Sequence, residues 1–417
     1  MKLLHPLMIP LYLVSFPVSA NSFIDDSKGS ITSRNYYLDR QYTDYKPIYG
    51  AKDWAQGFIA NWNSGYTEGS IGFGLDIQAM TAIKLHGDKK YLGTGLLPTN
   101  STTRQRANTS GEVGITAKVK YQDTELKVGT VQPWNPIVFS SPTRLLPQTF
   151  RGALIESKDF KQFEFVAGYL DQVNHRDSTN YEDFAITGAN GRFQSAKTDS
   201  VSYIGTKFNF SPTTQFGLYH GIVKNIYSQS AFTFKNEIKA TEDIKLLTDL
   251  RFWYSQDNGK SSAGKIDNTL LTGNIGFGYK DHRISLSTMQ NYGDTAHPYL
   301  TGGEVLLFIE GWSTDFLNPK EQVYGIRYDY DLKNVVPGLK FMTRYTKGTH
   351  INLPKLGGSN LEEDSLDFDL QYTLQTGFLK GLNVRVRHAI YDNNFATTAT
   401  FKPAKETRIN LDYTWKF

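Results

Sequence analysis

The sequence predicts an all-β protein, a transmembrane up-and-down β-barrel of eighteen antiparallel strands with short periplasmic turns and long extracellular loops. Three observations support this fold: alternating apolar and polar residues, two alternating lengths of connection, and an aromatic-rich composition. The 417 residues include 36 glycines, 26 phenylalanines and 25 tyrosines, and the mean hydropathy is −0.43. A polytopic helical membrane protein is excluded because it needs several apolar runs of about 20 residues.

Composition excludes further classes of protein. The 45 basic and 41 acidic residues leave a net charge of +4, too small a field to indicate a nucleic-acid-binding protein. Without cysteine, a disulfide scaffold, a thiolate zinc site and a cysteine nucleophile are all excluded. No HExxH, Walker A or Rossmann motif occurs, and Gly311–Asp315 has an aspartate where a nucleophile elbow needs glycine. We therefore expect neither an enzyme nor a bound cofactor or metal.

Residues 1–20 have the pattern of a secretory signal peptide. Lys2 supplies the positive end, an apolar stretch runs through Val14, and Val18-Ser19-Ala20 offers a small-residue cleavage site. Prolines within the stretch oppose the alternative of a buried helix. No later apolar run is long enough to cross a bilayer as a helix. We therefore expect residues 21–417 to be exported as a single domain, either soluble or a transmembrane barrel.

Alternation is clearest near the end of the sequence. Arg408–Phe417 places its apolar residues on one face and its polar residues on the other, as the side chains of a strand do. Ser365–Gln375 repeats the pattern, and similar segments recur along the chain. A soluble β-sandwich also alternates. The lengths of the connections therefore have to decide between a sandwich and a barrel.

Short and long connections alternate between the candidate strands. The short turns are 122–123, 159–161, 211–214, 280–281, 333–338 and 376–381. The long polar loops are 87–110, 132–148, 174–199, 297–320, 349–363 and 393–406. This segregation favours a transmembrane barrel, whose closed sheet satisfies its edge groups inside the bilayer. Aromatic residues near strand ends fit interfacial girdles, namely Tyr121, Tyr254, Tyr279, Tyr292, Tyr345, Tyr391 and Phe417.

Alternation also predicts which basic side chains face the lumen. Val384 and Val386 would face lipid, which sends Arg385 and Arg387 inward. An arginine on the lipid side would cost about 2–4 kcal/mol at the midplane, so this assignment is strongly constrained. The other basic residues that we assign to the lumen in this way are Lys340, Arg344 and Arg408.

This column of basic groups has two interpretations. Guanidinium binds carboxylate in a bidentate manner, and charged ladders in pores set selectivity, so the column could guide anionic solutes. Alternatively, the arginines only neutralise lumenal carboxylates. Those carboxylates are Asp367, Asp369 and Asp412.

Several motifs resemble those of the OprD-type outer-membrane porins. They are Gly29–Arg40, Trp54–Phe58, Ser64–Gly69, Gly72–Asp76, Arg144–Gly152, Gly264–Asn268, Pro337–Leu339 and Gly381–Arg387. The resemblance covers nearly all of residues 21–417 in collinear order. It implies an eighteen-stranded, substrate-specific channel of the Gram-negative outer membrane. In that family, the third loop folds inward and a basic ladder leads carboxylate solutes along the wall.

The resemblance also implies which residues line the pore. The ladder would comprise Arg40, Arg385, Arg387 and Arg408, whereas Arg344 and Lys340 fit by parity alone. Arg40 shares the face of Tyr36, Leu38 and Tyr42, so alternation alone would not send it into the lumen. The third loop would be 132–148. Its residues near the constriction would be Trp134, Asn135, Ser140, Ser141 and Arg144.

The sequence leaves the solute open. Members of the family take either basic amino acids and peptides or aromatic and cyclic carboxylates. A solute with a positive group would need acidic residues at the narrowest point, for which the candidates are Asp294, Glu304 and Asp315. The expected partners are small carboxylate solutes, outer-membrane lipid and lipopolysaccharide, and no nucleic acid. The expected oligomeric state is a monomer or a homotrimer. The alternatives are a wide general porin and an adhesion barrel with a blocked lumen.

Overall fold

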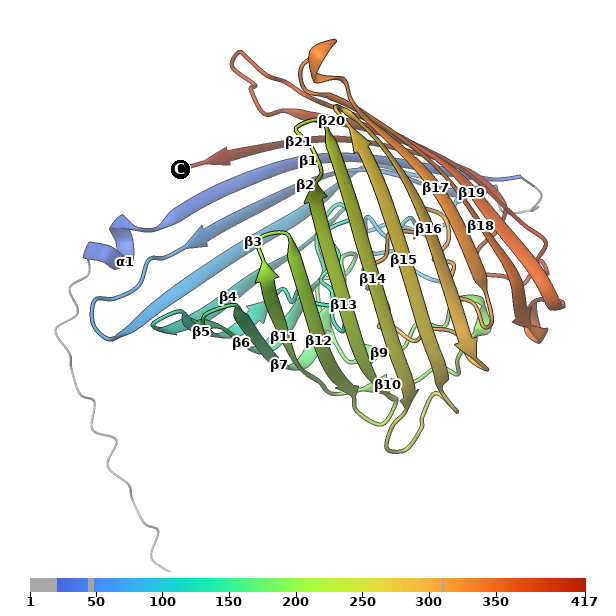
Figure 1. Cartoon of the computed structure of the whole chain (residues 1–417), viewed down its shortest axis with the longest axis horizontal. Helices are drawn as coiled ribbons and strands as arrows, with labels where there is room; N and C mark the ends of the chain where they lie inside the picture. The colour runs from blue at the N-terminus through green and yellow to red at the C-terminus, as the bar shows by residue number, and fades with distance from the viewer. Residues whose placement is uncertain (1–20, 44–48, 310) are drawn as a thin grey trace, which may run out of the picture.

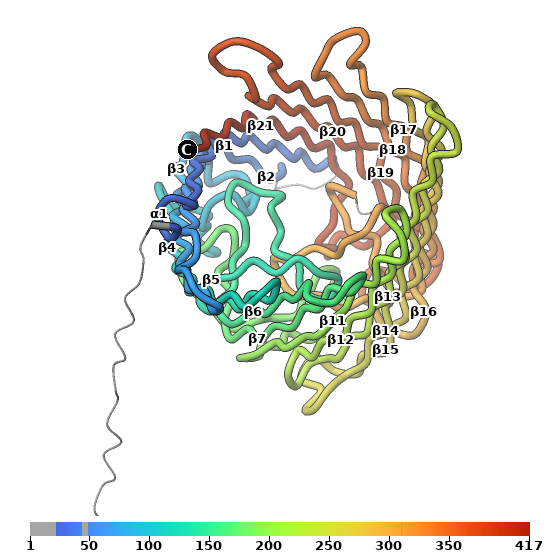
Figure 2. Tube along the Cα trace, turned by 60° about the vertical axis from the view of Figure 1, so that its left-hand side comes forward, coloured from blue at the N-terminus to red at the C-terminus, as the bar shows by residue number. Residues whose placement is uncertain are grey.

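Eighteen long strands form a closed antiparallel barrel (Figure 1 and Figure 2). The structure, a computed structural model, describes residues 21–43, 49–309 and 311–417. The expected signal peptide, residues 1–20, lies outside the described residues. β1 pairs with the last strand, β21, from Ser30 opposite Lys416 to Tyr42 opposite Ala404, and this pairing closes the barrel.

The strands follow one another around the barrel in chain order. They are β1 (Lys28–Tyr42), β2 (Gly50–Asn63), β3 (Ile71–Gly87), β4 (Thr109–Tyr121), β5 (Thr124–Val131), β6 (Thr149–Phe160), β7 (Phe163–Asn174), β11 (Val201–Ser211), β12 (Thr214–Val223), β13 (Tyr227–Lys239), β14 (Ile244–Asp257), β15 (Asp267–Tyr279), β16 (His282–Gly293), β17 (Gln322–Asp331), β18 (Leu339–Leu353), β19 (Gly358–Thr373), β20 (Asn383–Asn393) and β21 (Ala404–Lys416). The small elements are α1 (Asn21–Asp25), β8 (Tyr181–Glu182), β9 (Phe184–Ala185), β10 (Lys197–Thr198), η1 (Ala189–Gly191), η2 (Leu332–Asn334) and η3 (Pro354–Leu356). Among the described residues, no helix is long and apolar enough to cross a membrane.

The two faces of the wall differ as the alternation predicts. On β19, Phe368 and Leu370 are exposed on the outer face, whereas Asp367 and Asp369 are buried within the barrel. On β15, Ile275 is 63% exposed and its neighbour Asn274 only 3%. This distribution suits a wall with hydrocarbon outside and polar groups inside.

Connections of two kinds join the strands. The shortest turns are 122–123, 161–162, 212–213 and 280–281. The long loops on the opposite rim are named here L2 (88–108), L3 (132–148), L4 (175–200), L7 (294–321) and L9 (394–403). The prediction of a long loop over 349–363 is wrong. The β18–β19 hairpin continues, with Ile351 paired to Leu361, so that only 354–357 connect the two strands.

Most of the expected girdle aromatics lie on the outside of the barrel. Tyr121, Tyr254, Tyr279, Tyr292, Tyr345 and Phe417 are all exposed. Tyr391 is the exception, because its side chain faces inward and its hydroxyl donates to Glu363 Oε2 at 2.6 Å. Tyr391 lies an odd number of residues from Val386 on the same strand. Because Val386 faces outward, alternation itself predicts that Tyr391 faces inward.

Two loops fill much of the lumen. In Figure 2, stretches of L3 (teal) and L7 (orange) lie inside the ring of strands. Leu145 and Leu146 of L3 belong to a buried apolar cluster with Tyr36 and Leu38 of β1. These two β1 residues therefore face inward under L3, and alternation places Arg40 inside with them, contrary to the expectation from their apolar character.

Candidate functional site

The functional candidate is a cavity of about 400 Å³ inside the barrel, here called the arginine cavity. The neighbouring strands β20, β21 and β1 supply four of its basic side chains, while L3, L4, L7 and L9 close the other sides. Two carboxylates reach it, those of Glu304 and Asp315. The arginines that line it are Arg40, Arg144, Arg176, Arg385, Arg387 and Arg408.

Four of these arginines are paired with carboxylates. Arg40 and Arg408 both donate to Glu406, whose side chain is fully buried between them. Arg385 Nε lies 3.0 and 2.9 Å from the two carboxylate oxygens of Asp369. Arg176 Nη1 lies 3.7 Å from Glu304 Oε1. The carboxylate partners neutralise part or all of the positive charge of these four arginines.

Arg387 makes no ion pair with any described residue. Its Nη2 donates to Asn410 Oδ1 at 2.8 Å and to the Tyr36 hydroxyl at 3.2 Å. Its Cζ also lies 5.6 Å from the centre of the Trp312 ring. Neutral partners and aromatic faces hold this guanidinium in place without cancelling its charge.

Arg144 of L3 likewise forms no ion pair within the described part of the chain. Its Nε is buried and makes no hydrogen bond there. Burial, followed by the charges of Arg408 and Arg176, lowers the pKa of Arg144 to about 9, so the group still carries its proton at neutral pH. Six arginines and two carboxylates line the cavity, so positive charge is in excess among its lining residues.

Other wall arginines hold the loops through backbone carbonyl groups. Arg34 Nη1 donates to the carbonyls of Pro142 and Arg144 in L3, at 3.2 and 2.8 Å. The corresponding contacts to L7 are Arg251 to Leu306, Arg344 to Phe308 and Arg408 to Trp312. Part of the basic wall thus fixes the positions of L3 and L7, a role that differs from both sequence interpretations.

The structure brings together only some of the residues predicted from the sequence. Arg40, Arg144, Arg385, Arg387, Arg408, Glu304 and Asp315 all line the arginine cavity. Arg344 lies outside it, with its Nε 3.1 Å from Asp367 Oδ2. Lys340 lines a separate cavity of about 530 Å³ near the short turns, which Arg385 also reaches. Whether any of these side chains guides a solute stays a prediction.

The remaining predicted residues lie elsewhere. Ser140 and Ser141 are buried within L3, where the Ser141 hydroxyl lies 2.9 Å from that of Thr143. Asp294 Oδ1 lies 3.5 Å from Lys320 Nζ, and neither residue lines the arginine cavity. Trp134 and Asn135 line a different cavity, whose wall is formed by β2 to β7, β11 and β12.

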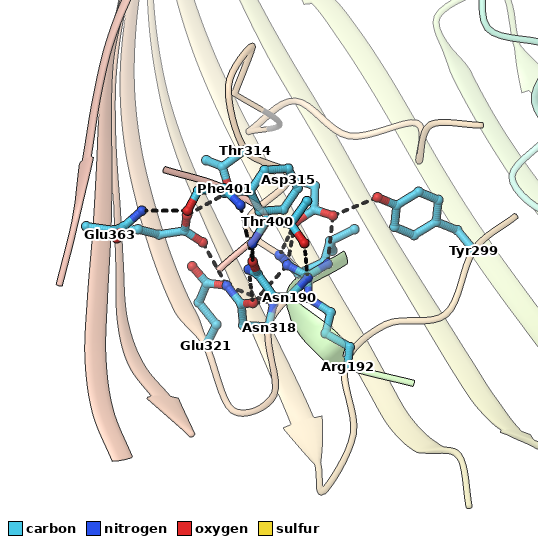
Figure 3. A network of polar contacts seen from close by, with 12 residues as sticks. Asn190, Arg192, Tyr299, Thr314, Asp315, Asn318, Glu321, Glu363, Thr400 and Phe401 are labelled. Atoms are coloured by element: carbon cyan, nitrogen blue, oxygen red, sulfur yellow. Dashed lines mark hydrogen bonds and ion pairs between the residues drawn. The ribbon is translucent and has the colours of Figure 1, made fainter. Parts of the chain in front are cut away.

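Asp315 belongs to a polar network that joins L4, L7, L9 and β19 (Figure 3). Arg192 Nη1 and Nη2 donate to its two carboxylate oxygens at 2.7 Å each, and Tyr299 donates at 2.7 Å. Burial alone would raise the pKa of Asp315, but the charge of Arg192 and these hydrogen bonds lower it below the usual value. Asp315 therefore serves to hold these loops together.

Sequence reasoning missed several residues of the cavity and its surroundings. Arg34 could have been found, because it lies an even number of residues from Arg40 on the same strand. Arg176 and Trp312 lie in L4 and L7, where no periodicity marks which side chains turn towards the lumen.

Comparison with known proteins gives consistent matches along the chain. Residues 21–417 match the family described as outer membrane porin, OprD family. The chain is 50% identical to Acinetobacter baumannii OccAB2, whose crystal structure superposes with a TM-score of 0.91 over 95% of this chain and 99% of that one. Pseudomonas aeruginosa OpdK, crystallised with vanillate, is 31% identical with a TM-score of 0.87, over 95% of this chain and 100% of that one. Porin D of Pseudomonas aeruginosa is 29% identical over 403 residues, 91% of this chain and 89% of that protein.

Proposed function

The chain belongs to the OprD family of outer membrane porins, channels integral to the outer membrane, and on this basis we propose that it conducts small carboxylate-bearing solutes through the arginine cavity. Passage is passive. L3 narrows the lumen at this level, since its Thr143 and Arg144 line the same cavity as the wall arginines. The solute's carboxylate moves along the arginines while the rest of the molecule follows.

The observation that carries this proposal is the pair Arg387 and Arg144. Both line the cavity, and neither has a carboxylate partner among the described residues. A guanidinium group without a counter-charge is available to an incoming carboxylate, whereas Arg385 is already bound to Asp369. Arg144 and Arg387 therefore guide the solute, and most of the other arginines pair with carboxylates or anchor the loops.

The chemistry of one similar protein agrees with this assignment. OpdK was crystallised with vanillate, an aromatic carboxylate. In this chain the ring of Trp312 lies beside Arg387 on the cavity wall. A planar acid could therefore place its carboxylate on Arg387 and its ring near Trp312.

The test measures swelling of proteoliposomes in gluconate and in sorbitol, a matched pair with and without a carboxylate. A charge-assisted hydrogen bond contributes about 1.5–3 kcal/mol, and 1.4 kcal/mol corresponds to about a tenfold change. We expect Arg144→Gln with Arg387→Gln to slow gluconate about tenfold and to leave sorbitol unchanged. In planar bilayers, the same variant should shift ion selectivity towards cations.

Lys405→Gln provides the control. Lys405 is exposed on the outer face, opposite Ile390, so its replacement removes a positive charge without changing the lumen. It should leave both rates unchanged. If the double arginine variant conducted gluconate like the parent protein, carboxylate guidance would be refuted, although the channel itself could stand.

A further inference from the structure

A second cavity, of about 340 Å³, lies inside the barrel on the arc that begins at β2, the neighbour of β1 in the wall of the arginine cavity. It is lined by side chains of β2 to β7, β11 and β12 close to the short turns, and by Trp134 and Asn135 of L3. We call it the tyrosine cavity, after Tyr203 and Tyr219 in its wall. L3 contacts both cavities, because Thr143 and Arg144 further along the loop line the arginine cavity.

Two glycines shape the wall of the tyrosine cavity. A Cβ atom on Gly168 would lie 2.3 Å from Tyr203 Cζ, and one on Gly205 would lie 2.1 Å from Tyr219 Cδ1. Each ring therefore lies directly against the backbone of a neighbouring strand, where only glycine leaves room. This packing fixes both tyrosines in the wall.

Two buried polar groups at this cavity lack a hydrogen bond. Asn135 is 3% exposed and Tyr203 is 4% exposed. The amide faces the phenol, but neither Asn135 Nδ2 nor Tyr203 Oη completes a hydrogen bond with any described residue. Buried polar groups in native proteins nearly always have partners, so each such group requires an explanation. An oxygen atom of a solute in the cavity would accept from both.

The charges of the tyrosine cavity are balanced, unlike those of the arginine cavity. Three lysines and three carboxylates line it. Lys207 Nζ lies 3.6 Å from Glu164 Oε2, and Lys127 Nζ lies 3.9 Å from Glu156 Oε2. The other polar groups are neutral hydroxyls and amides, and besides Asn135 the amides are those of Asn61, Asn63, Gln78 and Gln132. Such a lining suits uncharged hydroxyl groups better than a second carboxylate.

We propose that the tyrosine cavity is a second solute subsite, which binds hydroxyl groups of polyhydroxylated carboxylates. The solute's carboxylate contacts the arginines of the arginine cavity, and at the next stage of its passage Tyr203 and Asn135 bind its hydroxyl groups. The exposed ring of Trp134 adds an apolar face for the C–H groups of such a chain. This subsite deepens the proposed function and rests on it.

The experiment compares proteoliposome swelling in glucarate with swelling in adipate, a dicarboxylate of the same chain length without hydroxyl groups. Tyr203→Phe removes the hydroxyl and keeps the ring. We expect it to slow glucarate about threefold, as loss of a neutral hydrogen bond does, and to leave adipate unchanged. Tyr254→Phe, on the exposed outer face, is the matched control and should change neither rate.

Asn135→Ser is the second variant, because Asn135 Oδ1 also accepts from the backbone of Ile137 and Val138 at 2.9 and 3.0 Å. The serine hydroxyl keeps an acceptor for this turn, adds no charge that would repel both dicarboxylates and removes the Nδ2 donor, so the same selective slowing of glucarate is expected. Equal effects on glucarate and adipate, or no effect on either, would overturn the subsite.

The arginine variants separate this outcome from failure of the proposed function. If Arg144→Gln with Arg387→Gln slows both dicarboxylates and Tyr203→Phe slows neither, only the subsite is refuted. If the arginine variant slows neither solute, the proposed function fails as well. Unheated gel mobility of each variant verifies that the barrel has folded.

Discussion

Gly168 on β7 supports Tyr203 of the neighbouring strand β11, and this contact illustrates how single residues set the shape of the lumen. The rings of Tyr203 and Tyr219 lie flat against the inner face of the barrel wall, each over a glycine of the neighbouring strand. Ring and glycine occupy complementary space, so neither can change alone.

Gly168→Ala should therefore destabilise the barrel. Its new methyl group would overlap the Tyr203 ring, and overpacking of this kind costs about 1–3 kcal/mol. The measurement is the urea midpoint of the detergent-solubilised protein. Gly278→Ala is the matched control, because its nearest neighbour would be Lys245 Cβ at an ordinary 3.5 Å. Equal midpoints for the two variants would contradict the packing argument.

Alternation predicts the face of a side chain but not its partner. Arg344 and Arg387 both point inward as predicted, yet Arg344 is bound to Asp367 and to the Phe308 carbonyl, while Arg387 pairs with no carboxylate among the described residues. The difference depends on where L7 crosses the lumen, which periodicity does not encode. Tyr36 and Leu38 face the lumen despite their apolar character for a related reason, since L3 covers them inside the barrel.

At the scale of elements, the network of Figure 3 fixes four segments that are distant in the sequence. Asn190 of L4 accepts through Oδ1 from the backbone nitrogen of Thr400 in L9, at 3.0 Å. Asn318 of L7 donates through Nδ2 to Glu363 of β19, at 2.8 Å. The network buries three carboxyl groups, those of Asp315, Glu321 and Glu363, around the single guanidinium of Arg192.

The excess of buried carboxyl groups predicts a pH-dependent stability. Burial, followed by the charge of Glu363, raises the pKa of Glu321 well above its usual 4.5. The folded state therefore binds more protons than the unfolded state between pH 4.5 and the raised pKa, so this contribution to stability falls as pH rises through that window. Glu321→Gln removes the titration. Relative to the parent, the variant should become progressively more stable as pH increases.

Urea unfolding at a series of pH values from about 5 to about 9 measures this difference. Glu362→Gln is the control, because Glu362 is exposed and pairs with Lys347 Nζ at 2.7 Å. Its replacement should not reproduce the trend. Parallel pH profiles for the parent and Glu321→Gln would show that Glu321 does not hold a proton in the folded state.

How far elements can be predicted depends on how regular they are. The strands and their short turns follow from period-two patterning, because each strand meets the same lipid–lumen boundary. The prediction of a loop over 349–363 is wrong because the polar composition of this segment hides the continued pairing of β18 with β19 as far as Leu353 opposite Gly358. The network in L4, L7 and L9 depends on contacts between distant segments and leaves no local pattern.

For the whole molecule, closure between β1 and β21 joins the two ends of the described chain. Thr32 and Thr414 are register partners, and their hydroxyl oxygens lie 2.9 Å apart. Their Cβ atoms are therefore close enough for a disulfide after substitution. The protein lacks cysteine, so an introduced pair would have no competing thiols.

Thr32→Cys with Thr414→Cys should consequently oxidise to an intramolecular disulfide that makes most of the chain circular. After heat denaturation without reductant, the cross-linked chain should migrate differently on a gel from the reduced form. Thr32→Cys alone should show no such reductant-dependent shift in its monomer band. Because an open or differently ordered sheet would separate these two positions, failure to cross-link in an otherwise folded protein would contradict the closed barrel on which the positions of both lumenal cavities depend.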